Sequence, residues 1–170
     1  ALGTDITYVI AANPSSLIQL HRIAVENMDD IIRDIADGTL KNEVRTEIDT
    51  TQRNEVMAAF QPNPKRAKEL ESLVNKYDTR LRPKHYWPNL VCINTWKQGN
   101  CARILPQLDG YYPEQTVLRE FGYIASEGRL GIVLDNSWDY SLCAAHYYHF
   151  EFIPEEERDS TAPVVLSAHE

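Results

Sequence analysis

Apolar residues recur with two different spacings along the chain, and the spacing separates expected strands from expected helices. Short runs rich in β-branched and apolar residues at 6–12, 90–96 and 116–121 favour strands. The stretches that follow the first two runs carry apolar residues three or four positions apart, which is typical of helices with one buried face. This alternation predicts an α/β fold of layered strand-helix units with a mostly parallel sheet.

The clearest helix is expected between Leu17 and Asp37. Its apolar residues fall at positions 17, 20, 24, 28, 31 and 35, which places them on one helical face. Asn13 can cap the start, and Pro14 suits the first turn because its missing N–H costs nothing there. Gly38 is the expected left-handed residue just past the end. The pattern predicts a single helix of about twenty residues.

The middle of the chain contains further helical patterns broken by proline. Polar residues 41–60 are interpreted as one or two surface helices, and an Asn-Pro pair starts another helix at 65–77. Two prolines within 81–88 limit that stretch to a loop or a short helical turn. The helical spacing at 101–108 includes Pro106, so a short or kinked helix is expected there.

The C-terminal part, from about residue 116, is richer in strand patterns. Residues 131–134, 143–154 and 161–166 favour strands, so the fold is expected to finish in antiparallel strands. The whole chain, 1–170, is predicted to form one α/β domain, because its length suffices for one core.

A turn with unusual chemistry lies between the expected strands 116–121 and 131–134. Tyr123, Ser126 and Glu127 bring a phenol, a hydroxyl and a carboxylate together beside Gly128. Such groups can stack on a base, bind a phosphate oxygen and hold Mg²⁺. The alternative is a loop in which Ser126 and Glu127 only cap a neighbouring element.

Charge and cysteine content exclude several classes of protein. The net charge of −8 argues against a nucleic-acid or anionic-membrane partner, since both require a basic face. No apolar run reaches the length that spans a bilayer. The three cysteines have no CxxC spacing, which favours reduced, structural thiols and a cytoplasmic location.

Several stretches together resemble a known enzyme family. They are residues 13–15 with the helix that follows, 64–73 (PKRAKELESL), 87–90 (WPNL), 99–106 (GNCARILP), 123–128 (YIASEG) and 148–154 (YHFEFIP). In this order they are similar to the Gretchen Hagen family of auxin-responsive acyl acid amido synthetases, within the acyl-adenylate-forming superfamily. The Tyr–Glu turn and the late Phe-Glu-Phe-Ile-Pro are the more specific landmarks. The resemblance covers nearly the whole chain.

The resemblance implies that the chain is a central fragment of an adenylating N-terminal domain. The family's upstream Ser/Thr/Gly-rich phosphate loop and its downstream Tyr-Arg-x-Gly-Asp motif have no counterpart in this sequence. Ala125 stands where the family has serine, which leaves any phosphate contact to Ser126. The isolated chain is therefore expected to be inactive, although its parent would be an enzyme.

By the same resemblance, ATP and Mg²⁺ are the expected cofactors of the full-length enzyme. Tyr123 would stack on adenine, Ser126 would contact the α-phosphate, and Glu127 would bind Mg²⁺ as the catalytic and metal-binding residue, with Ala125 in the same nucleotide-binding turn. The residues expected to border the pocket of the acid are Trp96, Gly99, Tyr147 and Tyr148.

The implied reaction activates a small carboxylic acid as acyl-AMP and then conjugates it to an amino acid. Two alternatives stay open. One is a stand-alone binding or interaction module without catalytic activity, which Ala125 and the missing loop would suit. The other is an acyl-CoA-forming ligase of the same superfamily.

Overall fold

The computed structural model describes residues 2–40, 49, 51, 55 and 60–168. Contacts divide the chain into two compact units, residues 1–119 and residues 120–170, which we call unit 1 and unit 2. The surface helices predicted at 41–60 lie almost entirely outside the described residues. Whether the two units form one domain stays a prediction.

Unit 1 is built on a three-stranded parallel sheet. The strands are β1 (Tyr8–Ile10), β2 (Cys92–Thr95) and β3 (Val117–Glu120), in the order β1-β2-β3. β1 and β2 run parallel, with Val9 opposite Ile93. β3 joins the sheet through the Val117 N–H, which donates to the Val91 carbonyl at 2.8 Å. The predicted α/β fold with a parallel sheet is confirmed, and each strand is shorter than its apolar run.

The first long helical pattern forms two helices, not one. α1 (Ser15–Glu26) and α2 (Met28–Asp37) are separated at Asn27, whose φ of −117° and ψ of 22° leave the helical region. The Asn27 side chain donates to the Ile23 carbonyl at 2.9 Å. Asparagine side chains compete in this way with the helical backbone. The prediction of one uninterrupted helix was therefore wrong, while its end at Gly38, with φ of 67°, is confirmed.

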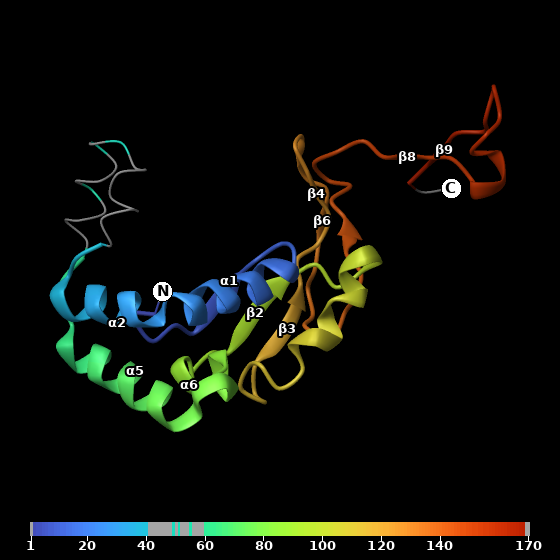
Figure 1. Ribbon diagram of the computed structural model, residues 1–170. Helices are drawn as coiled ribbons and strands as arrows, with labels where there is room; N and C mark the ends of the chain where they lie inside the picture. The colour runs from blue at the N-terminus through green and yellow to red at the C-terminus, as the bar shows by residue number, and fades with distance from the viewer. Residues whose placement is uncertain (1, 41–48, 50, 52–54, 56–59, 169–170) are drawn as a thin grey trace. The chain divides into compact units, whose positions relative to one another are not determined.

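The helix predicted at 65–77 forms where the sequence predicted it. α5 (Pro64–Tyr77) leads through a 3₁₀ turn, η1 (Asp78–Arg80), to the short helix α6 (Pro83–Tyr86). α5 packs along α2, as Figure 1 shows. The expected short helix at 101–108 is a pair of 3₁₀ helices, η2 (Gly99–Arg103) and η3 (Leu105–Leu108).

The cap of α5 yields a stability prediction. The Asn63 side-chain oxygen accepts the Arg66 N–H at 3.1 Å, which satisfies one donor of the first turn. Asn63→Ala should lower the free energy of unfolding by about 1 kcal/mol. Chemical denaturation followed by circular dichroism measures this change. Ser72→Ala is the matched control, because the exposed Ser72 hydroxyl only bonds the Lys68 carbonyl within the helix; an equal loss there would contradict the capping role.

The core of unit 1 lies between the sheet and the helices. Its most deeply buried apolar side chains come from α1, α5, α6, β2 and the residues just before β2: Leu17, Leu70, Tyr86, Leu90 and Ile93. The exposed residues Tyr8 and Ile10 alternate with Val9 along β1. Helices therefore cover the apolar side of the parallel strands, as the strand-helix alternation predicted.

A buried histidine joins this core to α6. His21 Nδ1 lies 3.0 Å from the Tyr86 hydroxyl, and the edge of His21 meets the ring of Tyr111. Burial and the nearby Arg82 charge lower the pKa of His21 below its usual value. Burial likewise raises the pKa of Tyr86. His21 is therefore neutral in the folded protein near neutral pH.

The neutral histidine makes stability depend on pH. Below about pH 6.5 the unfolded chain binds a proton at His21 that the folded protein does not, so stability falls as the pH drops below that value. Burial lowers the pKa of His85 too, which adds in the same direction. His21→Gln keeps a hydrogen-bonding group and should flatten the decline between pH 7 and 5, measured by urea unfolding. His149→Gln is the control, because the His149 side chain is 79% exposed. If the decline of stability with falling pH were as steep in His21→Gln as in wild type, the assignment of this decline to His21 would be wrong.

The described residues of unit 2 form short antiparallel strand pairs and one 3₁₀ helix. The pairs are β4 (Ile124–Ala125) with β5 (Gly128–Arg129), β6 (Gly131–Ile132) with β7 (Leu142–Cys143), and β8 (Glu151–Phe152) with β9 (Leu166–Ser167); η4 is Glu155–Glu157. The predicted antiparallel finish is confirmed.

The prediction of a long strand at 143–154 is wrong. β7 ends at Cys143, and a turn follows in which the N–H groups of Tyr147 and Tyr148 both donate to the Ala144 carbonyl. The chain is extended and paired again only at β8. Aromatic and apolar residues dominate this stretch, but its backbone is paired only at Cys143 and at Glu151–Phe152.

Among the described residues, no helix combines the length and the apolar character that crossing a bilayer requires.

Candidate functional site

The candidate turn is a tight β-hairpin. Ile124 pairs with Arg129 and Ala125 pairs with Gly128, so Ser126 and Glu127 are the two loop residues. Both loop side chains are exposed. The strands expected on either side, 116–121 and 131–134, form as the shorter strands β3 and β6. The structure adds the strands β4 and β5 inside the turn and pairs β6 with β7. A hydroxyl and a carboxylate are thus presented to solvent at the tip.

Tyr123 lies at the base of the hairpin. Its carbonyl accepts two hydrogen bonds, from the N–H groups of Leu130 and Gly131, each at 2.9 Å. Gly131 allows close packing, because a Cβ there would lie 3.0 Å from Tyr123 Cβ. The Tyr123 residue remains 58% exposed. The backbone is held while the phenol stays accessible, which suits a stacking role.

Two groups near the hairpin were not identified from the sequence. Glu120 is only 6% exposed, and its carboxylate accepts the Gly122 N–H at 3.1 Å. Arg129 donates to the Phe121 carbonyl at 3.1 Å and its guanidinium lies over the Phe121 ring. An acidic residue two positions before a glycine was the available signal for the first contact. Both contacts fix the chain that enters the hairpin.

The structure brings one predicted pocket residue to the hairpin. The hydroxyl of Tyr148 lies against Gly128, in the space that a Cβ would occupy. The neighbouring Tyr147 is 82% exposed. Tyr148 therefore contacts the nucleotide-binding turn predicted from the sequence, and Tyr147 lies in the same short turn that carries Tyr148.

Trp96 and Gly99 belong to unit 1. Trp96 follows β2, is half-buried, and donates its N–H to the Ala12 carbonyl at 2.9 Å. Gly99 opens η2 with φ of 59°, and no atom lies within 4 Å of where its Cβ would be. Both residues lie at the end of β2, an edge where parallel α/β sheets commonly bind ligands. Their role in binding the acid stays a prediction.

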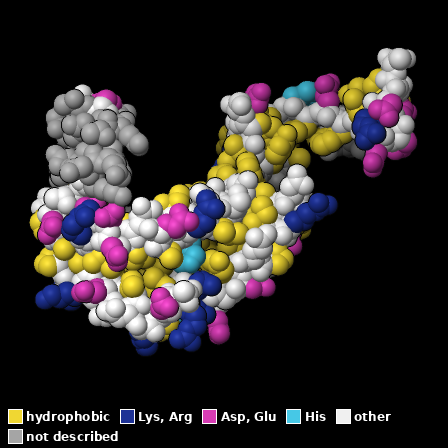
Figure 2. Space-filling model, viewed as in Figure 1, with side chains coloured by type: hydrophobic (Ala, Val, Ile, Leu, Met, Phe, Trp, Pro, Cys, Tyr) yellow, Lys and Arg dark blue, Asp and Glu magenta, His cyan; other side chains and the backbone are white. Residues whose placement is uncertain are grey.

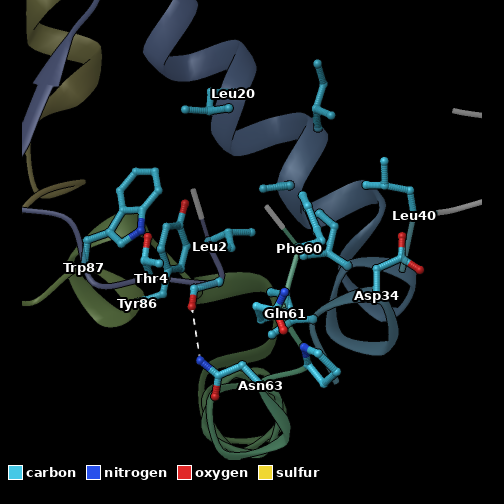
Figure 3. Close-up of a pocket in the computed structure, with 16 residues that line it drawn as sticks. Leu2, Thr4, Leu20, Asp34, Leu40, Phe60, Gln61, Asn63, Tyr86 and Trp87 are labelled. Atoms are coloured by element: carbon cyan, nitrogen blue, oxygen red, sulfur yellow. Dashed lines mark hydrogen bonds between the residues drawn. The ribbon is translucent and has the colours of Figure 1, made fainter. Parts of the chain in front are cut away.

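Unit 1 also contains a pocket of about 580 Å³ (Figure 3). Its wall is mostly apolar and is formed by Leu2, Gly3, Thr4, Leu20, Ile23, Ala24, Ile31, Asp34, Ile35, Leu40, Phe60, Gln61, Pro62, Asn63, Tyr86 and Trp87. Figure 2 shows hydrophobic surface between α2 and α5, with charged side chains along these helices.

None of the candidate residues from the sequence lines this pocket. Among the described residues of its wall, Asp34 has the one carboxyl group, and it already accepts from Arg33 and Thr39 at 3.3 and 3.2 Å. An apolar wall whose one carboxylate is already hydrogen-bonded offers no pair of catalytic groups for acid–base or nucleophilic chemistry. Of the two places, the hairpin is the better candidate site.

The hairpin fits a magnesium–nucleotide complex better than a metal held by protein alone. The described parts of the chain contain no group of three or more His, Cys, Asp and Glu side chains arranged to hold a metal. Magnesium ions at nucleotide sites, however, usually use one or two carboxylates and take their other ligands from phosphates and water. The single exposed carboxylate of Glu127 satisfies that requirement, with Ser126 beside it.

Solved structures are similar to this chain over almost its entire length. "GH3.15 acyl acid amido synthetase" matches with a TM-score of 0.73 and 20% identity, over 98% of this chain. "AtGH3.15 acyl acid amido synthetase in complex with 2,4-DB" matches with a TM-score of 0.73 and 21% identity, over 97% of this chain. The chain spans 30% and 28% of the length of these two proteins. At this identity the likeness establishes the fold.

Sequence comparison gives the family. A search of curated proteins found no match. Residues 1–117, however, match the profile described as "GH3 family N-terminal domain", which is well over half of the chain. The matched region contains β1, β2, α1, α2, α5 and α6, and it ends at Val117, the first residue of β3. The chain belongs to the GH3 family, through the N-terminal domain of that family.

Proposed function

We propose that this chain is part of an ATP-dependent acyl acid amido synthetase. The full enzyme activates a carboxylic acid as acyl-AMP and then transfers the acyl group to the amine of an amino acid. The observation that carries the proposal is the GH3 family match over residues 1–117. The fold shared with acyl acid amido synthetases supports it. A cytoplasmic location is part of the same proposal.

The hairpin of unit 2 is the proposed nucleotide contact. Tyr123 stacks on adenine through its exposed phenol, and the Ser126 hydroxyl donates to an α-phosphate oxygen. Ala125, which is half-buried within β4, contributes backbone only. The Glu127 carboxylate is available to hold Mg²⁺ beside the phosphates. When bound, the ion neutralises negative charge on the phosphate oxygens.

Charge accounts for why this arrangement suits adenylation. Attack of a carboxylate on the α-phosphorus builds up negative charge at that centre, so fixed donors and cations close to it lower the barrier. Two adjacent loop residues, held by paired strands, keep a fixed spacing between hydroxyl and carboxylate. Trp96 and Gly99 of unit 1 are proposed to border the acid, whereas the Tyr148 phenol of unit 2 is already packed against Gly128.

The test is acid-dependent exchange of labelled pyrophosphate into ATP by the full-length protein. Exchange that requires Mg²⁺ and a carboxylic acid supports adenylation, and an amide product after adding amino acids supports the synthetase. A thioester product with coenzyme A would instead support the acyl-CoA-forming ligase. If no exchange occurs with any acid in a panel of aryl and aliphatic acids, the result would favour the non-catalytic binding module, whether or not the protein binds ATP.

A further inference from the structure

The two-residue hairpin has its unusual backbone angle at Gly128 and not in the loop. Two-residue hairpin loops normally place one or both loop residues at positive φ. Neither Ser126 nor Glu127 has a positive φ, whereas Gly128 has φ of 151°. A side chain at Gly128 would therefore strain the backbone. The conformation of the tip depends on this single glycine.

A second constraint acts at the same glycine. Around the position that a Gly128 Cβ would take, Tyr148 Cζ lies 3.1 Å away and Cε1 lies 3.6 Å away, with the hydroxyl closer still. The end of the phenol thus packs directly on the backbone of the hairpin, on the first residue after the loop. Glu127 is the loop residue immediately before Gly128, so the phenol packs on the backbone next to the residue that carries the carboxylate.

Tyr148 is itself anchored to the base of the same hairpin. Its N–H donates to the Ala144 carbonyl at 3.2 Å, and the Ala144 N–H donates to the Leu130 carbonyl at 2.9 Å. Ala144 is buried, and the ring of Phe150 meets that of Tyr148 edge-on. The turn that presents the phenol is therefore bonded to the chain immediately after β5, so the turn and the hairpin are coupled.

We infer that Tyr148 is a positioning residue, which holds the Ser126–Glu127 loop through its contact with Gly128. This inference rests on the proposed function, in which that loop contacts ATP. A pair of two-residue strands is only marginally stable by itself. Displacement of a reacting or binding group by about 1 Å can cost about 100-fold in rate. The contact supplies the rigidity that the short strands lack.

The role differs from that of a residue in the pocket of the acid. A residue that contacts the acid changes the KM for the acid when it is replaced. A residue that positions the loop changes kcat of ATP–pyrophosphate exchange and the rigidity of the hairpin. Tyr148→Phe removes the hydroxyl, which is the atom nearest Gly128, but keeps the ring atoms Cζ and Cε1 that also lie beside it, so it should retain most of the function while Tyr148→Ala should not.

The experiment combines kinetics and hydrogen exchange on the full-length protein. In Tyr148→Ala, kcat of exchange should fall about 10- to 100-fold, with the KM for the acid within about threefold. Peptides covering residues 123–131 should exchange faster, because the N–H groups of Leu130 and Gly131 are bonded to Tyr123. Peptides from α5 should exchange at the wild-type rate. Tyr148→Phe should stay within about threefold of wild type in kcat.

Tyr140→Ala is the control, because Tyr140 is an exposed aromatic residue of the same unit that stacks on Trp138. Unchanged hairpin exchange in Tyr148→Ala, faster exchange in α5 as well, or a change confined to the KM for the acid would each overturn the inference. If Tyr148→Ala does not fold, Tyr148→Leu replaces it, with the same expected results. A wild-type protein without pyrophosphate exchange overturns the proposed function, and hydrogen exchange alone then decides whether Tyr148 holds the loop.

Discussion

Replacing Glu127 by glutamine in the full-length protein is expected to lower kcat of ATP–pyrophosphate exchange by about 100-fold or more. The amide is the same size but carries no charge, so it holds a magnesium ion far less well. The residue is exposed at the tip of a hairpin and has no packing role there. The free energy of unfolding should therefore stay within about 0.5 kcal/mol of wild type. Raising the Mg²⁺ concentration should recover part of the lost rate.

Glu156→Gln is the matched control for this variant. Glu156 is an exposed glutamate in η4, within the same unit. This substitution removes the same charge at a different place, so ATP–pyrophosphate exchange should continue at the wild-type rate. If Glu127→Gln lost stability in proportion to activity in thermal melts, Glu127 would have a structural role, and the proposed magnesium contact would be wrong.

Arg66→Met is expected to have the largest effect on stability, a loss of about 2–4 kcal/mol. Arg66 is 8% exposed, and its guanidinium donates to the Leu2 carbonyl at 3.0 Å and to the Tyr86 carbonyl. It also pairs with Glu69 at 2.8 Å. Methionine keeps the aliphatic stem but leaves both buried carbonyls without these donors. One side chain joins the N-terminal segment, α5 and α6, so its loss loosens all of them.

Arg22→Met separates this effect from the loss of a charge. Arg22 pairs with Glu26 at 3.7 Å, but both side chains are more than half exposed. An exposed pair of this kind contributes less than about 1 kcal/mol. Urea unfolding of both variants measures the difference. Similar losses in the two would mean that the buried hydrogen bonds of Arg66 contribute nothing beyond its charge.

The elements of unit 1 could be predicted because their signals are local. Asn63-Pro64 before an apolar stripe predicted both ends of α5 to within one residue. This was possible because the cap and the first turn lie next to each other in the chain. The break at Asn27 escaped prediction, although asparagine was visible, because the apolar spacing continues through it unchanged. Periodicity reports which face is buried and not whether the backbone bends.

Unit 2 shows where local patterns fail. Residues 143–154 are aromatic and apolar enough for a strand, yet only β8 and the end of β7 are paired. Strand formation depends on a partner edge, which the sequence of the strand itself does not encode. The turn at residues 123–128 was identified by its chemistry, but the packing of Tyr148 on Gly128 joins residues twenty positions apart. No spacing rule connects them.

The close approach of Gly38 to Pro62 makes one position decisive for the packing of α2 on α5. A Cβ at Gly38 would lie 2.7 Å from the Pro62 ring, and the Asn63 N–H donates to the Ile35 carbonyl at 2.7 Å. The chain thus leaves α2 and enters α5 at the same place. Gly38 also has a positive φ of 67°, which favours glycine. Any larger residue at Gly38 would therefore both strain the end of α2 and push the start of α5 away from it.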